Sequence, residues 1–169
     1  MIEFSDVIKN RRSVRDLSDT PLKENEILLI VEAGKLAPIA MGKYDKLLFT
    51  LIEKDELKKV KDNFLSSLNR DLFYGGSLLI IISQKDEIVD LYNQNAGCIL
   101  ENMMLEATNL GIGSVYLYSP IRVSRANPNL SKVLHIKEGY TPIAAAIFGY
   151  IKNNKINDKV NRKALIERY

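Results

Sequence analysis

Five consecutive residues near the N-terminus, Arg11 to Arg15, combine three arginines with one serine. A planar guanidinium group makes paired, charge-assisted hydrogen bonds to phosphate oxygens, and the Ser13 hydroxyl adds a further donor. Because the segment follows a short predicted helix, the negative end of the helix dipole faces it, and only the side chains can attract an anion there. We interpret the segment as a phosphate clamp. The alternative is a solvated basic helix end that only complements the dipole.

Two predicted helices flank this segment. Ile2, Phe4, Val7 and Ile8 are spaced to line one face of the first helix. The second helix stops just after Ala37, because Pro38 cannot continue it. Its buried side is predicted from the following residues: Ile27, Leu28, Ile30, Val31 and Leu36.

The rest of the chain alternates strands and helices. The wholly apolar run at 78–82 predicts a strand buried on both faces, in the centre of the sheet. The clearest helical pattern covers about residues 93–110, with Met103 and Met104 at core spacing, Cys98 interpreted as a core residue, and Gly111 as the C-cap. The other expected elements are strands at 47–52, 114–119 and 143–151, a surface helix at 55–68, a polar connection at 124–129 and a polar C-terminal arm over about 152–169.

Composition sets limits on the class of protein. The chain has 169 residues, of which 46% are hydrophobic and 27% charged, as expected for one soluble globular domain. The longest apolar run is too short to span a bilayer and no apolar signal region follows the start, so a cytoplasmic protein is expected. The single cysteine forms no internal disulfide, and no Cys/His spacing predicts a metal site.

Several kinds of site are disfavoured by the sequence. Gly111-Ile112-Gly113 follows a helix and opens a strand, the reverse of a dinucleotide-binding turn, and no Gly-Lys-Ser/Thr phosphate loop occurs. Cys98 and His135 form no recognisable nucleophile-base pair. The net charge of +3 is small and no nucleic-acid-binding motif is visible, so nucleic-acid binding ranks well below an enzyme.

Four segments, in this order, resemble the nitroreductase family of FMN-dependent oxidoreductases. They are the Arg-Arg-Ser-x-Arg segment, Ala-Pro-Ile-Ala-Met-Gly at 37–42, the segment 95–116 containing Ala-Thr-Asn-Leu-Gly, and C-terminal pieces at 134–139, 148–150 and 162–163. The resemblance covers nearly the whole chain. It implies one domain over residues 1–169 with an α+β fold, a three-layer α/β/α sandwich around a central, mainly antiparallel sheet.

The resemblance also implies the chemistry. FMN would carry a hydride from NADH or NADPH to an electron-poor acceptor such as a nitroaromatic or quinone, with no catalytic side chain required. Arg11 and Ser13 would hold the phosphate with Arg12 assisting, and Arg15 would lie near the pyrimidine edge. Further cofactor contacts implied by family position are Pro38, Ile39, Ala40, Met41, Tyr118, Ser119 and Arg162 or its neighbour Lys163. A homodimer is expected, with FMN between two subunits and no nucleic-acid or membrane partner.

The loop after Pro38 departs from the common family pattern. Ile39 replaces the usual Ser, Gly42 the usual Asn, and Tyr44-Asp45-Lys46 the usual Gln-Pro-Trp. These departures remove side-chain contacts at the ring edge and leave the choice of acceptor open. Two other functions also stay open: an FMN-binding module without efficient NAD(P)H turnover, and a protein that binds RNA or another anionic partner through residues 11–15.

Overall fold

The computed structural model describes residues 3–85, 89–153 and 164–168. The described strands are β1 (Leu47–Glu53), β2 (Leu78–Lys85), β3 (Ile112–Leu117) and β4 (Tyr140–Tyr150). The described helices are α1 (Phe4–Asn10), α2 (Glu24–Lys35), α3 (Lys54–Leu68), α4 (Val89–Asn109), α5 (Ser119–Ala126) and α6 (Pro128–Val133). Two 3-10 turns, Ala40–Gly42 and Tyr44–Lys46, connect α2 to β1.

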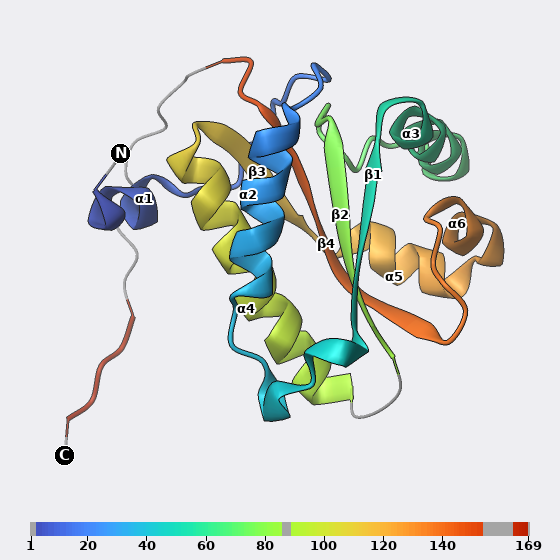
Figure 1. Cartoon of the computed structure of the whole chain (residues 1–169). Helices are drawn as coiled ribbons and strands as arrows, with labels where there is room; N and C mark the ends of the chain where they lie inside the picture. The colour runs from blue at the N-terminus through green and yellow to red at the C-terminus, as the bar shows by residue number, and fades with distance from the viewer. Residues whose placement is uncertain (1–2, 86–88, 154–163, 169) are drawn as a thin grey trace.

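The strands form one sheet in the order β1-β2-β4-β3, and every neighbouring pair is antiparallel. Helices α2 and α4 cover one face of the sheet, whereas α3, α5 and α6 lie on the other (Figure 1). The predicted three-layer α+β sandwich is therefore confirmed. Since β2 and β4 are the inner strands, both of their faces must be covered by helices.

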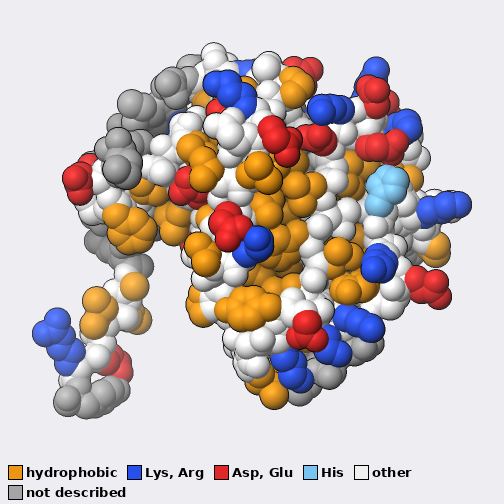
Figure 2. Space-filling model, viewed as in Figure 1, with side chains coloured by type: hydrophobic (Ala, Val, Ile, Leu, Met, Phe, Trp, Pro, Cys, Tyr) orange, Lys and Arg blue, Asp and Glu red, His pale blue; other side chains and the backbone are white. Residues whose placement is uncertain are grey.

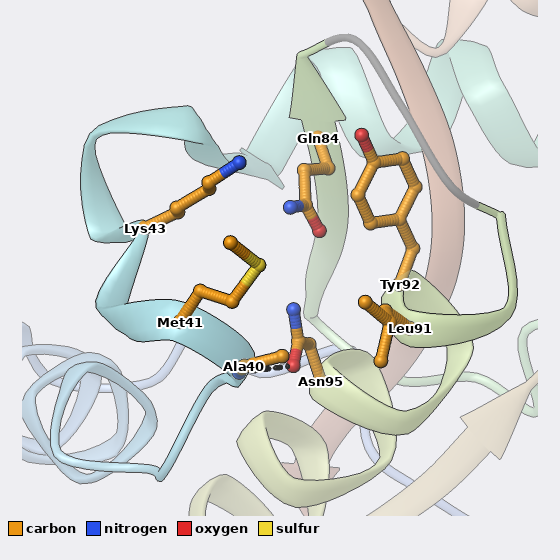
Figure 3. A pocket seen from close by; sticks show the side chains of 7 residues that line it. All are labelled: Ala40, Met41, Lys43, Gln84, Leu91, Tyr92 and Asn95. Carbon is orange, nitrogen blue, oxygen red and sulfur yellow. Dashed lines mark hydrogen bonds between the residues drawn. The ribbon is translucent and has the colours of Figure 1, made fainter.

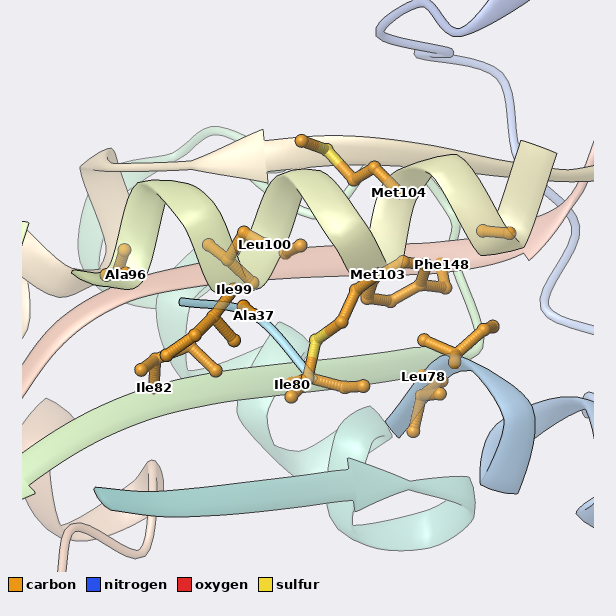
Figure 4. Packing of buried hydrophobic residues seen from close by; sticks show 14 of the residues in the cluster. Ala37, Leu78, Ile80, Ile82, Ala96, Ile99, Leu100, Met103, Met104 and Phe148 are labelled. Carbon is orange, nitrogen blue, oxygen red and sulfur yellow. The ribbon is translucent and has the colours of Figure 1, made fainter. Parts of the chain in front are cut away.

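The long helix α4 packs over the middle of the sheet. Met103 and Met104 are both buried, as predicted, and Met103 points toward Ile80 of β2 (Figure 4). Gly34 lets α2 approach α4 closely, because a Cβ at this position would lie 2.2 Å from the terminal methyl of Met103. Strand β2 is buried from Leu78 through Gln84, which confirms its predicted central place.

Several residues predicted to be buried are exposed. Leu28 and Leu36 are 58% and 73% exposed, because α2 turns Ile27, Ile30 and Gly34 toward the core instead. Of the residues expected to line one face of α1, Phe4 and Ile8 are exposed and Val7 is buried, while Ile2 lies outside the described residues. Figure 2 shows hydrophobic side chains gathered along the middle of this face, over α2 and the adjoining sheet.

The prediction that Cys98 is a core residue is also wrong, because its side chain lies on an exposed face of α4. The apolar period of this helix is satisfied by Ile99, Leu100 and Met103, which are fully buried, so the core does not need Cys98.

The chain between β3 and β4 differs from the prediction as well. The segment 124–129 is not a plain connection: it contains the end of α5 and the start of α6. Asn127 caps α6 by accepting hydrogen bonds from the backbone N–H of Asn129 and Leu130, and Pro128 occupies the first turn. These Asn and Pro residues therefore mark a helix start. Strand β3 begins at Ile112 rather than Ser114, and Ser119 already belongs to α5.

The segment after α1 lies across two glycines of the sheet. The side chains of Val14 and Leu17 are buried, and a Cβ at Gly113 would lie 2.6 Å from Leu17 Cδ2. A Cβ at Gly149 would lie 2.8 Å from the backbone oxygen of Ser18. The missing side chains of these glycines therefore leave the space in which the N-terminal segment packs.

We expect Gly149→Ala to destabilise the protein by about 1–3 kcal/mol, because the added methyl group would push the backbone at Ser18 off the sheet. Thermal or urea unfolding measures the loss. Gly97→Ala is the matched control: a Cβ there meets no atom within 4 Å, and alanine favours the helix by up to about 1 kcal/mol. Equal stability of the Gly149→Ala variant and the parent would contradict this packing.

Candidate functional site

The predicted phosphate clamp lies along the outer edge of β3. Ser13 forms a parallel bridge with Ser114, and the Val14 N–H donates to the Ser114 carbonyl at 3.0 Å. Since Val14 and Leu17 point into the core, the polar residues between and before them face outward. Pairing with the sheet therefore fixes the backbone of the clamp.

The three arginines have different surroundings. Arg11 is 17% exposed, and its Nε lies 2.9 Å from Oε1 of Glu101 on α4. The Arg15 guanidinium lies 5.8 Å from the centre of the Tyr74 ring, in a cation–π arrangement. Among the described residues, no carboxylate forms an ion pair with Arg12 or Arg15. Two of the three positive charges therefore have no described ion-pair partner.

A buried hydroxyl lies beside the clamp. Ser114 is 2% exposed, and its Oγ has no hydrogen-bond partner within the described structure. The Ser13 backbone bridges to this same residue. Two serines and three guanidinium groups thus belong to one stretch of the sheet edge, and donors of these types suit a phosphate monoester.

Two tyrosines follow Ser114 along the chain. Successive strand residues alternate between faces, so Ser114 and Tyr116 lie on the same face of β3 as Ile112, which packs with α4, whereas Tyr118 comes after the end of the strand. Tyr116 is partly exposed, and burial of the rest of its side chain raises the pKa of its hydroxyl. Tyr118 is exposed just beyond the strand, and Ser119 opens α5 with Pro120 in the first turn. An aromatic surface therefore continues along the strand from the clamp.

The predicted ring-binding loop is anchored closer to the N-terminal end of α4 than the clamp is. The Ala40 N–H donates to Asn95 Oδ1 at 2.9 Å, and the Tyr44 hydroxyl donates to the Ala37 carbonyl at 3.2 Å. Between these anchors Met41 has a φ of 61° and is largely exposed. Pro38 is exposed, and Ile39 is partly buried.

The clamp and the loop are joined to the same helix at different levels. Asn95 holds the loop and Glu101 contacts Arg11, and six residues of helix separate their Cα atoms by about 9 Å along the axis. Figure 1 shows α1 beside the C-terminal half of α4 and the two 3-10 turns near its N-terminal end. Within one chain, the two predicted cofactor-binding segments therefore lie apart.

Comparison with known proteins identifies the family. Residues 3–167 match the family model described as "Putative TM nitroreductase". The chain belongs to this nitroreductase family. A curated relative from Archaeoglobus fulgidus, named "Putative NADH dehydrogenase/NAD(P)H nitroreductase", is 28% identical over 159 residues, which are 92% of this chain and 89% of the relative.

Solved nitroreductases share the fold. A Bacteroides fragilis nitroreductase with bound FMN superposes with a TM-score of 0.80 at 22% identity, over 99% of this chain and 100% of the other. A Desulfitobacterium hafniense nitroreductase with bound FMN gives a TM-score of 0.79 at 22% identity, over 98% and 100% of the two chains. The match over the full length confirms that the sandwich is the nitroreductase fold.

The C-terminal arm of this nitroreductase is described only in part. Arg162 and Lys163, predicted as alternatives for a phosphate contact, lie outside the described residues. In the described stretch 164–168 of the arm, the side chains of Leu165 and Ile166 are exposed.

Three residues that organise the site were not predicted. Asn95, Glu101 and Ser114 each contact a predicted site segment from a distant part of the chain. For Ser114 a signal was present, because it alternates with Tyr116 and Tyr118 in a strand of the nitroreductase pattern. For Asn95 and Glu101 the helical pattern gave no signal, because neither belongs to the apolar residues that define it, although Asn95 is buried.

Metal binding and membrane crossing each need a recognisable arrangement of side chains. No group of three or more His, Cys, Asp or Glu side chains is arranged to hold a metal ion among the described residues. In the same part of the chain, no helix is both long and apolar enough to cross a bilayer.

Proposed function

We propose that this nitroreductase family member is an FMN-dependent oxidoreductase that takes a hydride from NADH or NADPH and passes it to an electron-poor acceptor, such as a nitroaromatic or quinone. The donor set at 11–15, held on the sheet edge beside the unpaired Ser114 hydroxyl, carries this proposal. The FMN bound to the two structural neighbours supports the choice of cofactor. When bound, FMN supplies the hydride chemistry.

In this proposal the chain's residues bind and orient the cofactor. Arg11, Arg12 and Ser13 hold the phosphate, while Arg15 places positive charge near the pyrimidine edge, where it favours the anionic reduced flavin. The loop residues Pro38, Ile39, Ala40 and Met41 lie against the ring, and Tyr118 and Ser119 present backbone groups on its far side. Arg162 or Lys163 closes on the phosphate.

We further propose a homodimer that brings the clamp of one subunit to the loop of the other. The clamp and the loop contact α4 through different residues, Glu101 and Asn95, and in this proposal the second subunit brings its loop to the clamp around one flavin. The exposed apolar side chains Phe4, Ile8, Leu28 and Leu36 give α1 and α2 the kind of surface that an obligate partner covers.

The first prediction concerns the clamp. Heat release and chromatography should recover FMN rather than FAD from the protein, and Arg11→Ala should weaken FMN binding at least tenfold, because a charged hydrogen bond is worth about 1.5–3 kcal/mol. Ser13→Ala should cost less. Lys9→Ala is the matched control, since it removes one exposed positive charge two residues away. If Arg11→Ala and Ser13→Ala both bind FMN as tightly as the parent, residues 11–15 do not bind the phosphate and are only a solvated basic surface.

The second prediction concerns the reaction. Because one flavin site serves donor and acceptor in turn, reduction of a quinone or nitroaromatic by NAD(P)H should give parallel double-reciprocal lines. Anaerobic mixing with NADH or NADPH should bleach the bound flavin. If neither nicotinamide bleaches it, the chain is an FMN-binding module rather than an enzyme.

The third prediction concerns assembly. Light scattering should give the mass of a dimer, with an interface above roughly 2,000 Å² in total. Leu28→Glu should produce monomers and loosen FMN together. Leu65→Glu is the control, because Leu65 is similarly exposed but lies on α3, on the other face of the sheet. A monomer that keeps its flavin on dilution would rule out the shared site.

A further inference from the structure

A cavity of about 290 Å³ lies beneath the loop between α2 and β1. Its described lining combines Ala40, Met41 and Lys43 of the loop with the end of β2 and the first turns of α4. Figure 3 shows the Met41 side chain pointing into the cavity, opposite Tyr92. The volume suits one planar ring with a small substituent and is too small for a dinucleotide.

Gln84 contributes an unpaired acceptor to this cavity. Its side chain is 4% exposed, and its Oε1 has no hydrogen-bond partner within the described structure. A buried polar atom without a hydrogen-bond partner lowers the stability of the folded protein by about 1–3 kcal/mol. The presence of such an atom therefore needs an explanation. Gln84 sits on an inner strand whose preceding residues are almost wholly apolar, which makes its polarity more notable.

Asn95 contributes a donor from the opposite side. Its Oδ1 accepts the Ala40 N–H at 2.9 Å, and this bond fixes which end of the amide faces the loop. The Nδ2 group consequently points into the cavity toward the Gln84 amide (Figure 3). No hydrogen bond joins these two amides among the described contacts.

A ligand group that pairs with both Gln84 Oε1 and Asn95 Nδ2 needs an N–H donor next to a C=O acceptor. A primary carboxamide has both on one edge: its N–H₂ donates to Gln84 Oε1, and its oxygen accepts from Asn95 Nδ2. Leu91 and Tyr92 supply apolar contacts for a ring that carries the carboxamide. In the amide orientation that the structure records, a carboxylate in the same place would put an oxygen without a proton opposite Gln84 Oε1.

We propose that this cavity binds the carboxamide of a nicotinamide ring, with Gln84 and Asn95 as the residues that recognise it. The assignment of the ring to NADH or NADPH rests on the proposed function. Ala40 and Met41 line this cavity and belong to the loop proposed to lie against the flavin, so a ring held here stays beside the cofactor site. The proposal concerns substrate recognition and involves no covalent step.

The test compares Gln84→Met with the parent protein. Methionine matches glutamine in length and removes both polar atoms, so the variant should be at least as stable as the parent in thermal unfolding. Nicotinamide alone, followed by NMR line broadening, should bind the parent but bind the variant about tenfold more weakly. Nicotinic acid should bind neither protein well. In turnover, the KM for NADH should rise about tenfold while the KM for a quinone stays unchanged.

Ser83→Ala is the matched control. Ser83 is also a buried residue of β2 with an unpaired hydroxyl, but it does not line the cavity. It should gain stability and keep nicotinamide affinity. Equal binding of nicotinamide by the parent and Gln84→Met, or of nicotinamide and nicotinic acid by the parent, would overturn the proposal.

A second comparison tests whether the cavity binds a carboxamide of the electron acceptor instead of the carboxamide of the hydride donor. It uses 4-nitrobenzamide and nitrobenzene as the acceptors. If Gln84→Met raises the KM for 4-nitrobenzamide alone and leaves that for NADH unchanged, the assignment to the donor is wrong. Failure of the proposed function is a separate result, because it would appear as a parent protein that binds nicotinamide but neither holds FMN nor oxidises NADH.

Discussion

The packing of helices on both faces of an apolar sheet is the constraint on which the molecule depends. Strands β2 and β4 have neighbours on both sides and are buried along nearly their whole length, so each of their faces needs a helical cover. Helix α4 supplies much of that cover on one face. Once it is fixed there, Asn95 and Glu101 determine where the loop and the clamp can lie. The candidate site is thus positioned by a helix whose main role is burial.

The elements of this core were predictable because their patterns are local. An apolar run without alternation indicated the buried strand β2, and apolar residues at helical spacing indicated α4 with Met103 inside it. The exposed Leu28, Leu36 and Phe4 could not be predicted in this way. Periodicity shows that a face is apolar, but not whether the covering surface comes from the same chain. The Asn-Pro start of α6 was mistaken for a loop because the same residues favour both.

The candidate site was predictable in residue type rather than in place. Arg11, Ser13 and Arg15 were predicted to bind phosphate because guanidinium and hydroxyl groups suit phosphate, whatever fold carries them. Their position on the β3 edge depends on contacts with Ser114 and Glu101, about 90 or more residues away in the sequence, which no local pattern encodes. Gln84 was overlooked for a related reason. Its polarity gains meaning only when burial and the facing amide of Asn95 are known.

The backbone contacts of Ser13 and Val14 with β3 also protect the molecule against aggregation. β3 is an edge strand, and an edge with free N–H and C=O groups invites a strand from another molecule. The N-terminal segment takes up part of that edge through the Ser13 bridge and the Val14 hydrogen bond to Ser114. If this segment dissociates from β3, the backbone N–H and C=O groups of the strand edge become available for pairing with another molecule. The arginines of the predicted clamp also flank this cover with positive charge, and charged side chains at a sheet edge disfavour pairing with another strand.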